Sequence, residues 1–170
     1  IAEITCDSYR SAIKNVPNDL ALGFMPFNTN DGLADVKWEE HYAYVLELFD
    51  SSPIFETRKT DTWAAFVGLE TENNKKWLSN FQKALRNMPR LAVSGSDAHC
   101  FSGTPGDNDK RGYGDFPSDK ITWIKANPTF EGLKQAIKEP AKRSFLGKEP
   151  EKVKVIENNK SFFLDRLRVR

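Results

Sequence analysis

The sequence contains few of the residues that usually build covalent frameworks or metal clusters. Among its 170 residues there are two cysteines and two histidines. Two cysteines supply no disulfide framework, which favours a reducing cytoplasm. The chain also has no apolar run long enough to cross a bilayer, no signal-type N-terminus and no Gly-x-x-x-x-Gly-Lys-Ser/Thr phosphate loop. We therefore expect a soluble cytoplasmic protein with no membrane partner and no P-loop in this stretch.

The composition is typical of a folded domain, but the charge is distributed unevenly. Hydrophobic residues make up 39% and aromatic residues 12% of the chain, enough for a real core. Residues 138–170 hold ten basic and five acidic side chains, although the net charge of the whole chain is only +1. We interpret residues 1–147 as one domain and residues 148–170 as a basic linker. Such a basic tail can contact nucleic acid, an acidic partner domain or only water.

The order of apolar and polar segments predicts an α/β fold. Continuous apolar runs between turn residues predict strands, and apolar residues at three- and four-residue spacing predict helices. The predicted strands are residues 20–27, 53–57, 91–95 and 121–126, and the predicted helices are 2–15, 38–49, 72–88 and 127–139. Residues 145–147 are expected to complete this domain. Strands that alternate with helices imply β-α-β units around a parallel sheet or barrel. Residues 153–157 and 162–169 alternate as half-exposed strands do.

Helix ends and buried faces are predicted from the same spacing. Asp35 is a candidate cap for the second helix, and Asn127 with Pro128 starts the last one before Pro140 stops it. Residues 58–71 are polar and rich in threonine, and we expect a connection there. The expected buried faces are Trp38, Tyr42, Val45 and Phe49, then Trp77, Phe81, Leu85 and Met88, and finally Phe130, Leu133 and Ile137.

The stretch Leu-Ala-Val-Ser-Gly-Ser-Asp-Ala-His at residues 91–99 carries the strongest candidate site. An apolar strand breaks at Gly95 and is followed by Asp97 and His99, whose side chains would point the same way in an extended segment. A carboxylate and an imidazole on one side can bind a divalent cation. The alternative is a local hydrogen-bonded turn, because two ligands are too few to hold a metal.

These residues resemble a known family. The Gly-Ser-Asp-Ala-His segment at the end of an apolar strand is similar to the last metal-binding motif of the PHP (polymerase and histidinol phosphatase) phosphoesterases. The later run Trp-Ile-Lys-Ala-Asn-Pro-Thr-Phe-Glu-Gly-Leu, residues 123–133, resembles PHP domains fused to an SMC-like or AAA-like ATPase. The resemblance covers residues 91 to about 147.

The resemblance carries expectations about fold, cofactor and partners. It implies the C-terminal portion of a PHP-like (β/α) barrel, with residues 148–170 leading into the ATPase domain of the same parent chain. It implies hydrolysis of phosphoesters in nucleic acid or nucleotides, with a role such as DNA repair, by Mn, Zn or Mg ions that Asp97 and His99 help to bind. Because the chain begins at Ile1, we interpret it as a piece of a longer protein. A partial barrel exposes strand edges, so a homo-oligomer is also expected.

The sequence departs from the family in its ligands. The family gathers an early His-x-His and further His and Glu residues, but this chain has only His41 and His99. Either the other ligands lie upstream of Ile1 or the site has degenerated, and we expect the chain itself to be inactive. Glu56, at the end of its strand, is the third candidate site residue and a second carboxylate beside Asp97. Arg58 and Lys59 follow it and either contact a phosphate or neutralise Glu56. The alternative function is a non-catalytic regulatory or interaction domain of the ATPase.

Overall fold

The computed structural model describes residues 4–17, 20–29, 32–96, 98, 100–101 and 119–162. Strands β1 (Phe24–Pro26), β2 (Ile54–Glu56) and β3 (Leu91–Val93) form a parallel sheet in the order β1-β2-β3. Strands β4 (Ile121–Ile124) and β5 (Ser144–Gly147) form an antiparallel pair. The predicted mixed α/β fold with parallel strands is therefore confirmed, whereas the described strands do not close into a barrel.

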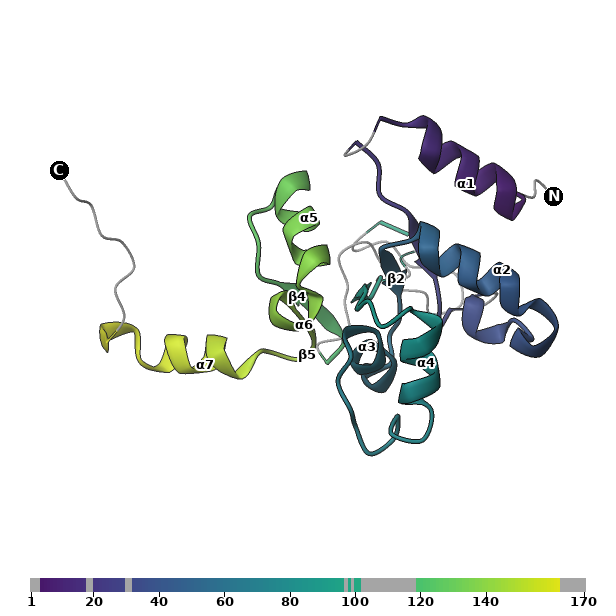
Figure 1. Ribbon diagram of the computed structural model, residues 1–170. Helices are drawn as coiled ribbons and strands as arrows, with labels where there is room; N and C mark the ends of the chain where they lie inside the picture. The colour runs from purple at the N-terminus through teal and green to yellow at the C-terminus, as the bar shows by residue number, and fades with distance from the viewer. Residues whose placement is uncertain are drawn as a thin grey trace.

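Helices precede, separate and follow these strands. They are α1 (Cys6–Asn15), the 3-10 turn η1 (Leu33–Asp35), α2 (Trp38–Ser51), α3 (Thr60–Val67), α4 (Leu78–Ala84), α5 (Phe130–Lys138), α6 (Pro140–Arg143), α7 (Glu151–Asn158) and the 3-10 turn η3 (Lys160–Phe162). Figure 1 shows α1 beside α2, α3 beside α4, and α7 extending away from the other elements. Within the described residues, no helix combines the length and apolar content needed to span a bilayer.

The three parallel strands end at one level. Pro26 of β1 and Val93 of β3 both pair with Glu56 of β2, so the segments that follow all three strands leave the sheet at the same edge. In open parallel sheets, ligand sites lie outside the carboxyl ends of the strands. The sheet therefore positions the residues after 26, 56 and 93 as neighbours.

A cluster of phenylalanine rings forms the main core on one side of the sheet. Phe55 of β2 stacks on Phe66 of α3 with ring centroids 4.7 Å apart, and Phe66 meets Phe27 and Phe81 edge-on, each at 5.0 Å. Fully burying one such side chain stabilises the fold by about 1.5–3 kcal/mol. A smaller cluster of Ile54, Leu91 and Ala136 packs α5 against the sheet.

The α3 helix corrects the prediction of a connection over residues 58–71. All residues from Thr62 to Val67 are buried. A helix that is buried on every side shows no amphipathic period, and its polar start resembles a loop in sequence. Gly68 ends the helix with a φ of 81°, in the left-handed region that glycine tolerates.

The helix predicted over residues 72–88 is much shorter. The buried side chain of Asn74 donates to the carbonyl oxygens of Leu69 and Asp61, which holds the segment before α4 in turns. At the other end Arg86 and Asn87 adopt left-handed φ values of 55° and 54°. A polar side chain with several backbone partners competes with helix formation, and spacing alone does not reveal this competition.

Three helix ends also differ from the predictions. Asp35 lies in η1, and Lys37 is the N-cap of α2. Thr129, not Asn127 or Pro128, caps α5 by accepting a hydrogen bond from the Gly132 amide. A threonine hydroxyl that accepts a hydrogen bond from an amide in the first turn stabilises the start of a helix, so α5 begins after Thr129 and not at Pro128. Pro140 does follow the end of α5, but it begins α6.

Residues 153–157 form part of helix α7 and not the predicted strand. The helix has no buried residue, and Lys154 pairs with Glu151 at 3.5 Å within it. An isolated strand leaves its backbone groups without partners, whereas a helix satisfies them internally. Of the second predicted strand, 162–169, only Phe162 is described, and it belongs to η3; the rest lies outside the described residues.

Candidate functional site

The candidate site lies where β2 and β3 end. The carboxylate of Glu56 packs against the backbone of Gly95, and a Cβ at position 95 would lie 2.8 Å from Oε1 of Glu56. Only glycine leaves room for this close approach. Glu56 is therefore held beside the segment that continues from β3 toward residues 97 and 99.

Asn28 and Thr57, which lie just beyond the ends of β1 and β2 respectively, support the same edge. The amides of Phe27 and Asn28 donate to the Glu56 carbonyl at 3.0 and 3.2 Å, and the Thr57 amide donates to the Val93 carbonyl at 2.8 Å. The buried Thr57 hydroxyl donates to Oδ1 of Asn28 at 2.7 Å and accepts from the amide of Lys59 at 3.1 Å. These hydrogen bonds tie the start of the basic segment to the sheet.

The second sheet closes the other side of this edge. The amide of Ser94 donates to Oγ1 of Thr122 at 2.8 Å, and the Ser94 hydroxyl donates to the carbonyl of Lys120. Lys120, which immediately precedes β4, is thereby brought to the residues that follow β3.

A polar cavity of about 540 Å³ opens beside the site. Its cationic lining residues are Arg58, Lys59 and Lys120, and its other lining residues are Thr60, Asp61, Thr62, Asn73, Trp77 and Asp119. Arg58 also faces Glu56, with its terminal nitrogen 4.0 Å from Oε1. Arg58 therefore connects the candidate carboxylate with the cavity.

The acidic groups of the cavity do not cancel this cationic character. Asp61 accepts hydrogen bonds from the hydroxyl of Thr71 at 2.8 Å and from the side-chain amide of Asn73 at 3.1 Å. Three cationic and two acidic side chains line the cavity, which leaves a net charge of +1. The lining can therefore attract an anion such as a phosphate group.

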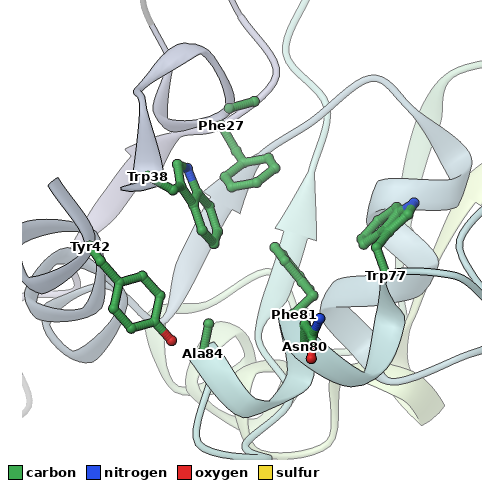
Figure 2. Close-up of a pocket in the computed structure, with 8 residues that line it drawn as sticks. Phe27, Trp38, Tyr42, Trp77, Asn80, Phe81 and Ala84 are labelled. Carbon is green, nitrogen blue, oxygen red and sulfur yellow. The ribbon is translucent and has the colours of Figure 1, made fainter. Parts of the chain in front are cut away.

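A second, aromatic pocket of about 420 Å³ lies between α2 and α4. Its lining residues are Phe27, Ala34, Trp38, Tyr42, Trp77, Asn80, Phe81 and Ala84 (Figure 2). Tyr42 and Trp77 lie on opposite sides of the lining, with Phe81 between them (Figure 2). Both were predicted as buried core residues, and both are instead exposed, Tyr42 at 49% and Trp77 at 37%. Met88 and Phe130 are likewise exposed, whereas Val45, Phe49, Phe81 and Leu85 are buried as predicted.

The predicted site residues are brought together only in part. Glu56, Arg58 and Lys59 do lie at one edge of the sheet. Asp97 and His99 lie outside the described residues, and the described part of the chain contains no group of three metal-ligating side chains. His41 is 57% exposed on α2, within 4.0 Å of Glu40.

The sequence did not predict that three residues of this region, Thr57, Trp77 and Lys120, belong to the candidate site. Thr57 directly follows Glu56, and its position at a strand end could have indicated it. Trp77 was assigned to the core because its spacing matched a buried helical face. Lys120 carries no recognisable signal, because only the pairing of Ser94 with the second sheet brings it here.

Comparison with known proteins identifies no relative of this chain. No family model, curated protein or solved structure matches the chain. The fold defines a mixed α/β protein with a parallel three-stranded sheet and a polar edge at the carboxyl ends of its strands.

Proposed function

We propose that this chain is part of a PHP-type metal-dependent phosphoesterase that acts on phosphoesters of nucleic acid or nucleotides. Asp97, His99 and Glu56 are the proposed metal ligands, and Arg58 and Lys59 are the proposed phosphate contacts. In this proposal the catalytic parent protein carries an ATPase domain after residues 148–170.

The observation that supports this proposal most is the contact between Glu56 and Gly95. Its position at the end of a strand marks Glu56 as a candidate site carboxylate, and Gly95 belongs to the Gly-Ser-Asp-Ala-His motif. Oε1 of Glu56 lies 2.8 Å from the position of a Cβ on Gly95, so the carboxylate touches the motif itself. Asp97 is two residues further along the chain.

The residues at this edge fit a divalent cation in their chemistry. The Glu56 side chain is 19% exposed, so its carboxylate is partly withdrawn from water while still open to a ligand. Carboxylate oxygens suit Mg and Mn, and imidazole suits Zn. When bound, such a metal supplies Lewis-acid polarisation of a phosphoryl oxygen. Arg58 and Lys59 would hold and orient the phosphate, because guanidinium and ammonium groups form charge-assisted hydrogen bonds to it.

The proposed domain boundary is compatible with the course of the chain after β5. Helix α7 begins at Glu151, has no buried residue, and exposes Val155 and Ile156. Exposed apolar side chains on a projecting helix are suited to packing against a following domain.

Calorimetric titration of the protein with Mn²⁺ and Zn²⁺ tests the metal site. We expect binding that is lost in an Asp97→Ala, His99→Ala double variant and weakened about tenfold or more in Glu56→Gln. His41→Ala and Glu72→Gln are matched controls, because they remove exposed groups of the same types on α2 and in the turns before α4. Binding that survives the double variant would contradict the proposal, because the metal would then be held by other residues. No binding to the unaltered protein would also contradict it and would favour the non-catalytic regulatory domain.

A further inference from the structure

We propose that the aromatic pocket and the adjoining cationic cavity form one nucleotide site, with the nucleobase in the pocket and the phosphate in the cavity. This inference deepens the proposed function by naming the substrate unit, and it rests on that function for the reaction that follows binding. Binding itself depends only on side chains described above and requires no metal.

The aromatic pocket has the size and walls that a nucleobase needs. Trp38, Tyr42, Trp77 and Phe81 contribute aromatic surface from α2, from α4 and from the residue preceding α4. Stacking on aromatic side chains tolerates any base, because every base has a π-face. Asn80 and Tyr42 add polar groups at the rim, and an amide and a hydroxyl can form hydrogen bonds with base edges (Figure 2).

The cationic cavity supplies the complementary charge. Lys59 and Lys120 line it, and Arg58 lines it while also facing Glu56 at 4.0 Å. A phosphate in this cavity would therefore lie beside the carboxylate that we propose as a metal ligand. The Lys59 amide is held by Thr57, so the backbone of this basic segment is tied to the sheet before any ligand binds.

Trp77 is the shared wall of the two cavities. Its indole nitrogen donates to the carbonyl of Asn73 at 3.2 Å, and its ring meets Phe81 edge-on at 5.5 Å. These contacts orient the ring while 37% of the residue remains exposed, and Trp77 lines both the pocket and the cavity. A base stacked on Trp77 would thus place its own phosphate toward Lys59 and Lys120.

Calorimetry with adenosine 5′-monophosphate, adenosine and ribose 5-phosphate in the presence of EDTA tests the two-part site. We expect adenosine 5′-monophosphate to bind about tenfold or more tightly than either part alone, since only the whole nucleotide occupies both cavities. Equal affinity for the nucleotide and ribose 5-phosphate would overturn the proposal, because it would show that the aromatic pocket takes no part.

Matched variants separate the two cavities. Trp77→Ala should lower the affinity for the nucleotide to that of ribose 5-phosphate, and a Lys59→Gln, Lys120→Gln variant should lower it to that of adenosine. Lys76→Gln is the control, because Lys76 is an exposed neighbour of Trp77 that lines neither cavity. If Trp77→Ala does not fold, Tyr42→Ala replaces it, because Tyr42 is an exposed residue on the opposite wall of the aromatic pocket. Unchanged nucleotide binding in folded Trp77→Ala, or in Tyr42→Ala where it replaces that variant, overturns the proposal.

A further arm identifies the source of the nucleotide, and the conditions of measurement keep the two proposals apart. A 5′-phosphorylated tetra-adenylate that binds more tightly than the mononucleotide would assign the site to a strand end, and the reverse order would assign it to a free nucleotide. Nucleotide binding is measured in EDTA, and metal binding is measured without nucleotide. Failure of the nucleotide titration therefore overturns the two-part site alone, and failure of the metal titration overturns the proposed metal site alone.

Discussion

The indole nitrogen of Trp63 donates to the hydroxyl of Ser144 at 3.3 Å, across 81 positions of sequence. Both residues are buried, and the Ser144 hydroxyl in turn donates to the carbonyl of Pro140 at 2.8 Å. This pair joins α3, which packs on the parallel sheet, to β5 of the antiparallel pair. The two sheets are therefore linked by a specific buried contact as well as by apolar packing.

Ser144→Ala should lower the free energy of unfolding by about 1–3 kcal/mol, because it leaves the buried Trp63 N–H without its acceptor. Urea unfolding followed by circular dichroism measures this loss. Ser79→Ala, an exposed serine in α4, is the control and should change stability by less than about 0.5 kcal/mol. Equal effects of the two substitutions would show that the Trp63 contact contributes nothing.

Gly95→Ala should weaken metal binding more than it weakens the fold. An added Cβ would meet the Glu56 carboxylate at 2.8 Å, and the end of that side chain can rotate away at small cost. We expect a Mn²⁺ affinity reduced about tenfold, with unfolding free energy changed by less than about 1.5 kcal/mol. Calorimetry and urea unfolding of the same preparation test this. An unaltered Mn²⁺ affinity would remove Glu56 from the proposed ligands.

Thr57→Val should destabilise the protein by about 1–3 kcal/mol while preserving side-chain shape. The substitution removes the buried hydroxyl that donates to Asn28 and accepts from the Lys59 amide. Urea unfolding provides the measurement, and Thr60→Val, at an exposed position of the same segment, is the control. If both variants lose the same stability, the hydrogen bonds of Thr57 are not the cause.

Glu139 should titrate below the usual range of a glutamate. Hydrogen bonds from Arg143, and then from Lys142, lower the pKa of its carboxylate. Because the pKa is lower in the folded state, the stabilisation is complete above the unfolded-state pKa and is lost as the pH falls through the folded-state value. The stabilisation that Glu139 contributes is small, because its side chain is at the surface. A carboxyl NMR titration measures this pKa, and Arg143→Gln should raise it. An unchanged pKa in that variant would show that Arg143 is not the cause of the lowered pKa.

The strands were predictable to different degrees. Residues 54–56 and 91–93 form strands as predicted, because continuous apolar runs between turns identify buried parallel strands. The run 20–27 contributes only Phe24–Pro26 to the sheet, and its first residue, Leu20, is exposed. Apolar content marks a candidate strand, but the length of its partner decides how much of it pairs.

The candidate site was predictable only one residue at a time. Position at the end of a strand indicated Glu56, and adjacency indicated Arg58 and Lys59. The contact of Glu56 with Gly95 joins segments 39 positions apart, and nothing local in either segment encodes it. Trp77 shows the opposite failure, because helical spacing predicted burial for a side chain that stands at the mouth of two cavities.

The sequence by itself determined the α/β class, the order of the main strands and the polar residues at their ends, since apolar periodicity and turn residues act locally. Only the tertiary structure decided that residues 60–67 form a buried helix, that residues 153–157 are helical, and that Lys120 lies beside Arg58 and Trp77. These outcomes depend on which surfaces and backbone groups find partners elsewhere in the fold. Such long-range pairing leaves no period in the sequence.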